Sequence, residues 1–211
     1  MIDSQSIDSN QKAAEVISRG GVIAFRTDTF YGLGADPFNQ DAVRAIKQLK
    51  GREDNKPILI VISDYEQLDR FISSISPAFD LLARRFWPGP LTLIGAARSE
   101  LPPEITAGTK TVGVRLPNDD KVRLLVRACG GALTATSANP SHAAPATTAR
   151  QVHEYFGEAV DLIVDDGGAQ TDRPSTVVDV SRDEPRLIRE GVIPWSMVIE
   201  ELEEIHKVPL S

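Results

Sequence analysis

The chain has 211 residues, with 23 Lys and Arg against 30 Asp and Glu, and therefore a formal net charge of −7. Hydrophobic residues at 41% and charged residues at 25% are typical of a folded globular protein, which argues against disorder. The lone cysteine excludes a disulfide framework and a cysteine-rich zinc site. Because the apolar stretches are too short to cross a bilayer and the polar N-terminus lacks a signal segment, we expect a cytoplasmic protein without membrane contact.

Charge is distributed unevenly along the chain. Residues 1–150 carry 18 basic and 16 acidic side chains, whereas residues 151–211 carry 5 basic and 14 acidic ones. The acidity therefore belongs to the last third of the chain. The total charge does not argue against a ligand that carries phosphates.

Strand-like runs recur from end to end and alternate with helix-like segments. Apolar, β-branched runs predict strands at residues 20–25, 57–62, 91–97, 111–117 and 132–137, and then at DLIVDD, STVVDV and PRLIRE. The run at 57–62 is typical of a central strand that is covered on both faces. Short connections between the last three strands indicate that part of the sheet is antiparallel.

Apolar residues at helical spacing predict the helices. These extend over 41–50, from Pro77 to Trp87, after a cap at Asn118 or Asp119, from Thr147 or Thr148 to residue 156, and over the acidic segment 195–205. The alternation predicts an α/β fold, with a twisted, mostly mixed sheet and helices on its faces. We expect a single domain over residues 1–211.

A polar, glycine-containing segment, TDTFYGLG (27–34), follows the first predicted strand. Small hydroxyl residues and glycines at a strand end let backbone and side-chain donors approach a ligand closely. A turn that merely reverses the chain explains the same residues. On spacing alone, the turn is the better interpretation.

Three cations, Lys50, Arg52 and Lys56, lie within seven residues at the end of a predicted helix. Lys50 can simply complement the helix C-terminus, whereas Arg52 and Lys56 lie beyond it and could converge on phosphates. Neither a P-loop nor a Rossmann fingerprint is present. A phosphate site and a solvated charge cluster are about equally compatible with this segment.

Further polar residues occupy strand ends or apolar strands. Ser137 and Asn139, two apart in TSANPS, could face one ligand, although such residues also dominate ordinary turns. Arg115 lies in the apolar strand TVGVRLP, and Arg189 lies in PRLIREG. Each needs a counter-charge, either a structural ion pair or an anionic ligand. Ser175 opens the strand STVVDV and could donate its hydroxyl. The three histidines show no metal-ligand spacing, so we expect no protein-held metal.

The motifs together carry a resemblance. TDTFYGLG, then KxR with a following KP, then RFWPGPLT, VGVRLP, TSANPS, STVVDV and LIREG, in that order, closely resemble the YrdC-like family of threonylcarbamoyl-AMP synthases. The resemblance covers roughly Gly20 to Gly191. It implies an α/β sheet curved around a large basic cleft.

The resemblance implies an activity. Members of this family use L-threonine, bicarbonate or CO2, and ATP with Mg2+ to make threonylcarbamoyl-adenylate and pyrophosphate. A separate tRNA threonylcarbamoyl transferase machinery then modifies the adenosine next to the anticodon. Because the carbamate of threonine is the nucleophile, no Ser-His or Cys-His pair is needed. Weak direct binding of tRNA is also compatible with the resemblance.

By position, the resemblance assigns two groups of residues. The first faces the phosphates and nucleotide of ATP, with Lys50 and Arg52 as catalytic residues, and consists of Lys50, Arg52, Lys56, Ser137, Asn139 and Arg189. The second holds threonine, with Arg115 facing its carboxylate, and consists of Thr29, Arg115 and Ser175.

The chain departs from the family pattern at several positions. Arg26 replaces the usual proline before TDT, Phe30 replaces a valine, and Glu53 replaces a proline after KxR. Arg26 adds a charge near the expected threonine pocket. It keeps open an alternative, a family paralogue with a different carbamoyl or nucleotide substrate. A second alternative is a non-catalytic RNA-binding module, although no RNP-type motif supports it. The chain ends soon after LIREG and resembles the short form of the family.

Overall fold

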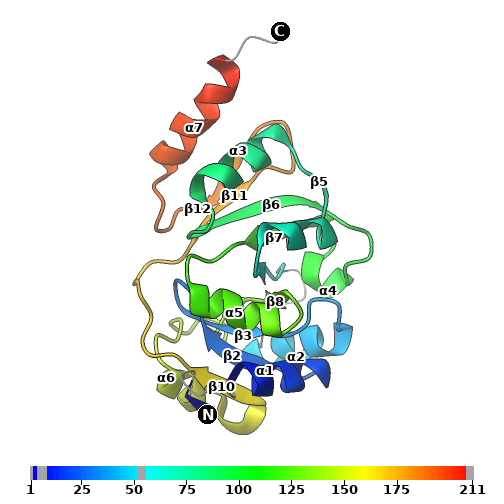
Figure 1. Ribbon diagram of the computed structural model, residues 1–211, viewed down its shortest axis with the longest axis vertical. Coiled ribbons are helices and arrows are strands. Elements are labelled where there is room, and N and C mark those ends of the chain that lie inside the picture. Colours follow the sequence, from blue (N-terminus) through cyan, green and yellow to red (C-terminus); the bar gives the residue numbers. More distant parts are fainter. Residues whose placement is uncertain (1, 4–8, 52–55, 208–211) are drawn as a thin grey trace.

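Two β-sheets of mixed strand direction form the framework of the protein (Figure 1). The computed structural model describes residues 2–3, 9–51 and 56–207. The smaller sheet is five-stranded, in the order β1 (Ile2–Asp3), β10 (Leu162–Asp165), β2 (Ile23–Arg26), β3 (Tyr31–Gly34) and β9 (Thr136–Ser137). The larger is seven-stranded, in the order β12 (Arg186–Arg189), β11 (Thr176–Asp179), β6 (Leu91–Ala97), β7 (Thr111–Arg115), β4 (Ile60–Ile62) and β8 (Ala132–Thr134), with β5 (Ile72–Ser74) beside β6.

Helices surround the two sheets. They are α1 (Ser9–Ser18), α2 (Gln40–Lys50), α3 (Pro77–Phe86), α4 (Pro103–Thr106), α5 (Asp120–Ala128), α6 (Ala149–Phe156) and α7 (Trp195–Lys207), with short 3-10 turns η1 (Tyr65–Arg70) and η2 (Gly157–Ala159). The predicted α/β class is confirmed. Within residues 2–3, 9–51 and 56–207, no helix is long and apolar enough to span a bilayer.

Local signals set the helix ends. The side chain of Asp119 accepts hydrogen bonds from the backbone N–H groups of Lys121 and Val122, and Thr148 accepts one from Gln151 N. These contacts satisfy N–H groups that have no partner within the helix. The amphipathic helix predicted after Pro77 is α3, which buries Phe79, as expected from its helical spacing.

The segment predicted as one strand over 132–137 divides between the two sheets. β8 pairs antiparallel with β4 in the larger sheet, whereas β9 pairs antiparallel with β3 in the smaller one. Ala135 lies at the crossing, where its N–H donates to Leu59 O at 2.9 Å. This crossing brings the segment that begins at Ser137 to the boundary between the sheets.

The segment TDTFYGLG is a β-hairpin rather than a loop throughout. β2 and β3 pair antiparallel with Arg26 opposite Tyr31, and residues 27–30 form the turn. Gly34 lies against the ring of Phe25, where a Cβ would stand 2.6 Å from Cε1. A larger residue at position 34 would therefore displace a buried aromatic side chain.

Candidate functional site

A cavity of about 850 Å³ lies between the two sheets. The smaller sheet contributes the β2–β3 turn with Thr29 and the β9 residue Ser137. The larger sheet contributes Arg115 from β7, and also Ser175 and Arg189 from the region of β11 and β12. The structure therefore brings together five of the predicted site residues, although they lie far apart in the sequence.

Arg115 is the most deeply buried cation of the cavity, with 3% of its surface exposed. Its Nη2 lies 3.2 Å from Asp28 Oδ1, and its Nη1 donates to Thr29 Oγ1 at 3.3 Å. Burial lowers the pKa of Arg115, and the negative charge of Asp28 opposes that shift. The arginine thus has the structural ion pair that the sequence left open, and it also lines the cavity.

Arg189 lies next to Ser175 on the same wall. Its Nη2 donates to Ser175 O at 2.9 Å and to Ser175 Oγ at 3.2 Å. Burial lowers the pKa of Arg189, and the positive charge of Arg115 lowers it further. Two guanidinium groups that line one cavity and repel each other favour an anionic ligand in that cavity.

The turn that carries Thr29 is ordered by its own hydroxyl groups. Thr29 N donates to Thr27 Oγ1 at 3.1 Å, and Thr27 Oγ1 donates to Phe30 O at 2.8 Å. Both threonines are buried and line the cavity. The turn therefore presents small hydroxyl groups to a ligand in a fixed geometry.

Lys50 connects the end of α2 to the segment Ser137–Asn139. Its Nζ donates to the main-chain oxygens of Ser137 and Asn139, the latter at 2.7 Å. Ser141 N in turn donates to Lys50 O at 2.8 Å. Two of the predicted nucleotide segments therefore lie side by side. Lys50 is 5% exposed, and its ammonium group is directed at these oxygens.

The remaining predicted nucleotide residues differ in their placement. Asn139 is not among the residues that line the cavity, and its Nδ2 donates to Pro140 O and Ala143 O, each at 2.8 Å. Lys56 is exposed, and the neighbouring Pro57 lines the cavity. Arg52 lies outside the described residues.

Three residues of the site were not assigned a role from the sequence. Asp28 holds Arg115, and Thr92 Oγ1 lies 3.0 Å from Ser175 Oγ. Asp172 is exposed but lines the cavity as the only carboxylate among its described residues. The sequence signals available were a carboxylate between two threonines, for Asp28, and a threonine in an apolar strand, for Thr92. Neither is specific by itself.

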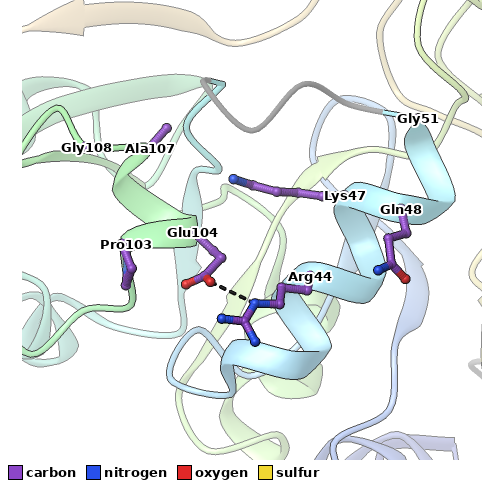
Figure 2. A pocket seen from close by; sticks show the side chains of 8 residues that line it. All are labelled: Arg44, Lys47, Gln48, Gly51, Pro103, Glu104, Ala107 and Gly108. Carbon is purple, nitrogen blue, oxygen red and sulfur yellow. Dashed lines mark hydrogen bonds and ion pairs between the residues drawn. The ribbon is translucent and has the colours of Figure 1, made fainter.

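A second cavity, of about 650 Å³, lies between α2 and α4 (Figure 2). Lys47 points into it from α2, and Glu104 Oε1 accepts a hydrogen bond from Arg44 Nε at 2.9 Å. None of the predicted site residues is among the described residues that line it. The candidate site is therefore the cavity between the sheets.

Comparison with known proteins agrees with the motifs. A family model that covers the Sua5, YciO and YrdC proteins, described as telomere recombination, matches residues 15–191. The chain belongs to this family. Among curated Sua5/YciO/YrdC proteins, it is 42% identical over 165 residues to a threonylcarbamoyl-AMP synthase of Thiobacillus denitrificans, covering 78% of this chain and 87% of that protein. It is 38% identical over 196 residues to one of Pyrococcus abyssi, covering 93% of this chain but 56% of the relative.

Solved structures of the family show the same fold. The Sua5 protein of Pyrococcus abyssi complexed with L-threonine superposes with a TM-score of 0.89 at 36% identity, covering 92% of this chain and 57% of that one. The Escherichia coli protein YciO gives a TM-score of 0.79 at 27% identity, covering 88% and 90%. The chain thus spans little more than half of the Pyrococcus protein and nearly all of YciO.

Proposed function

We propose that this chain is a threonylcarbamoyl-AMP synthase, which joins L-threonine, bicarbonate or CO2, and ATP to give threonylcarbamoyl-adenylate and pyrophosphate. The observation that carries the proposal is the pair of guanidinium groups, the buried Arg115 and the more exposed Arg189, in one cavity with several hydroxyl groups. The curated relatives bear this name, and a related Sua5 structure contains L-threonine.

Threonine occupies the Arg115 end of the cavity in this proposal. Its carboxylate approaches Arg115 and relieves the repulsion between Arg115 and Arg189. The hydroxyl groups of Thr29 and Ser175 then hydrogen-bond the polar groups of the amino acid. A fixed, buried position favours reaction because the entropy of orientation is lost on binding rather than at the transition state.

In the proposed reaction an N–C bond and an O–P bond form, and one P–O bond of ATP breaks. The threonine amine gives up a proton and forms an N–C bond with CO2, which yields a carbamate. A carbamate oxygen then attacks the α-phosphorus of ATP, and the bond between this phosphorus and the bridging oxygen of pyrophosphate breaks. Catalysis rests on orienting the carbamate and on neutralising phosphate charge, so no protein nucleophile is required.

Residues at the other end of the cavity handle ATP in this proposal. Ser137 lines the cavity, Lys56 lies next to the lining residue Pro57, and Arg52 belongs to the same KxR segment. Mg2+ enters with ATP as part of the substrate, since phosphate oxygens and water are its usual ligands. The main-chain contacts of Lys50 support a role in holding the segment Ser137–Asn139 in place.

Several broader statements belong to the same proposal. The chain works as a single domain over residues 1–211 in the cytoplasm, and its adenylate passes to a tRNA threonylcarbamoyl transferase machinery. Arg26 was the reason to consider a family paralogue with a different substrate. It is not among the residues that line the cavity. Arg26 therefore adds no charge to the lining of the cavity. Direct contact with tRNA is weak because the chain carries a net charge of −7.

Pyrophosphate release tests the proposal. The purified chain is incubated with ATP, Mg2+, L-threonine and bicarbonate, and each co-substrate is left out in turn. Release that requires both threonine and bicarbonate supports the synthase. Release that is unchanged without threonine contradicts it, and salt-sensitive tRNA binding without any turnover supports the RNA-binding alternative.

A further inference from the structure

Arg26 occupies the end of β2 and is buried, with 6% of its surface exposed. Its Nη2 lies 2.7 Å from Asp119 Oδ2 and 2.6 Å from Asp166 Oδ2, and its Nε donates to Asp166 O at 3.0 Å. Burial by itself lowers the pKa of Arg26, but the two carboxylates outweigh burial and raise the pKa above its ordinary value. The arginine thus joins β2 to the start of α5 and to the segment after β10.

Two further side chains complete this cluster, which we call the Arg26 clamp: Arg26, Asp119, Lys121, Asp166 and Gln170. Lys121 Nζ lies 3.0 Å from Asp166 Oδ1, and Gln170 Nε2 donates to Asp119 Oδ2 at 3.2 Å. Asp119 also caps α5 through Oδ1. Each carboxylate oxygen therefore has a donor, and the cluster holds three separate segments together.

One chain of contacts leads from the clamp to Arg115. Asn118, next to Asp119, donates its backbone N–H to Asp28 Oδ2 at 3.4 Å. Asp28 Oδ1 in turn lies 3.2 Å from Arg115 Nη2. The position of the Arg115 guanidinium therefore depends on Asp28, and the position of Asp28 depends on the turn that Arg26 holds.

A second chain of contacts leads from the clamp to the opposite wall. Asp166 and Gln170 fix the beginning and the middle of the segment 166–175. The end of this segment contributes Asp172, Pro174 and Ser175 to the cavity. Arg26 itself does not line the cavity, yet both chains of contacts from it end at the residues expected to bind threonine.

We propose that Arg26 is a positioning residue for the threonine end of the cavity, and that it acts through Asp119 and Asp166 on Arg115 and on the wall that carries Ser175. This inference rests on the proposed function, because it takes threonine as the ligand at Arg115. A hydrophobic residue can often replace a buried ion pair without loss of stability. What a hydrophobic residue cannot supply is a cation whose Nη2 contacts both carboxylates while its Nε donates to Asp166 O.

The experiment measures the affinity for L-threonine and, separately, for ATP by isothermal titration calorimetry. The variants are Arg26→Met, Arg26→Lys and Gln170→Ala, with Arg84→Gln as the control because Arg84 pairs with Asp80 on the exposed face of α3. We expect the threonine dissociation constant to rise about tenfold in Arg26→Met and about threefold in Gln170→Ala. Arg26→Lys keeps the positive charge but loses the Nε contact to Asp166 O, so its threonine dissociation constant should fall between those of the wild type and Arg26→Met. The ATP dissociation constant should stay within about twofold.

If Arg26→Met does not fold, Arg26→Lys and the uncharged Gln170→Ala decide the question. Threonine affinities equal to the wild type in both of these, or an equal loss of threonine and ATP affinity, overturn the inference. A wild type that binds threonine but releases no pyrophosphate contradicts the synthase activity while leaving the comparison of variants valid. A wild-type protein that binds no threonine overturns both the proposed synthase activity and the positioning role of Arg26.

Discussion

Lys50 and Asn139 lie 89 positions apart in the sequence, and Lys50 Nζ donates to the main-chain oxygen of Asn139 at 2.7 Å. The same ammonium group also donates to Ser137 O. The resemblance to the family assigns Lys50 to the group that faces the phosphates of ATP. Here its contacts attach the helix end to the strand end that carries Ser137.

Lys50→Met should therefore lower both stability and use of ATP. Loss of the ammonium removes the Lys50 donor from Asn139 O and leaves Ser137 O with the N–H of Asn139, and this should cost about 1–3 kcal/mol in the free energy of unfolding. We expect the melting temperature to fall by several degrees and the KM for ATP to rise. Lys12→Met on the exposed side of α1 is the control. An unchanged melting temperature in Lys50→Met would show that these contacts do not hold the segment.

Lys56→Ala should behave differently. Lys56 is exposed, and its proposed role is to neutralise phosphate charge. We expect pyrophosphate release to be abolished while the melting temperature stays within about 2 °C of the wild type. Arg52→Ala should give the same result, and Arg150→Ala on the exposed surface of α6 serves as the control. Wild-type rates of pyrophosphate release in both Lys56→Ala and Arg52→Ala would show that these two residues do not bind the phosphates of ATP.

Arg115 and Asp28 form a pair that a double-mutant cycle can separate from ligand binding. Arg115→Met leaves the Asp28 carboxylate, whose side chain is 4% exposed, without its cation. This change should cost about 3–5 kcal/mol in the free energy of unfolding. Arg115→Met/Asp28→Asn should recover much of that stability, because the buried charge is removed as well.

Threonine binding should not recover in the double variant, since Arg115, the proposed partner of the threonine carboxylate, is still missing. Calorimetry with L-threonine checks this, and L-threonine amide, which lacks the carboxylate, should bind the wild type weakly. A double variant that binds threonine as tightly as the wild type would rule out Arg115 as the carboxylate ligand.

Cys129 should be unreactive in the folded protein. Burial raises the pKa of its thiol to about 12 from 9.0. Between these values the unfolded chain loses the thiol proton first, so the unfolded state binds fewer protons and stability falls as pH rises. Urea unfolding at pH 8 and pH 10 should show a smaller loss of stability for Cys129→Ala than for the wild type. Equal losses, or rapid labelling of the native thiol at pH 8, would contradict the burial.

The helices α2, α3, α5, α6 and α7 were predictable because their signals are local, whereas α1 and the short α4 were not predicted. Asp119 and Thr148 mark the starts of α5 and α6 by capping contacts that involve residues two or three positions away. The division of residues 132–137 between two sheets was not predictable. Each half is chosen by a distant partner, β4 for one and β3 for the other, and nothing in ALTATS itself marks Ala135 as the crossing.

The contacts of single atoms in the candidate site were likewise not predictable from the local sequence. The motifs indicated which segments meet, and Thr29, Arg115 and Ser175 do line one cavity. The direction of the Asn139 amide depends on acceptors within its own loop, Pro140 O and Ala143 O, and could not be derived from spacing. The role of Asp28 as the partner of Arg115 likewise required the pairing of distant strands.

The most direct test of the central claim is the identity of the product. The wild-type chain is incubated with Mg–ATP, L-threonine and 13C-labelled bicarbonate, and the nucleotide products are analysed by mass spectrometry. We expect an AMP adduct that contains threonine and one labelled carbon, together with pyrophosphate. Formation of threonyl-AMP without the labelled carbon, or no adduct from protein that binds both threonine and ATP, would contradict it.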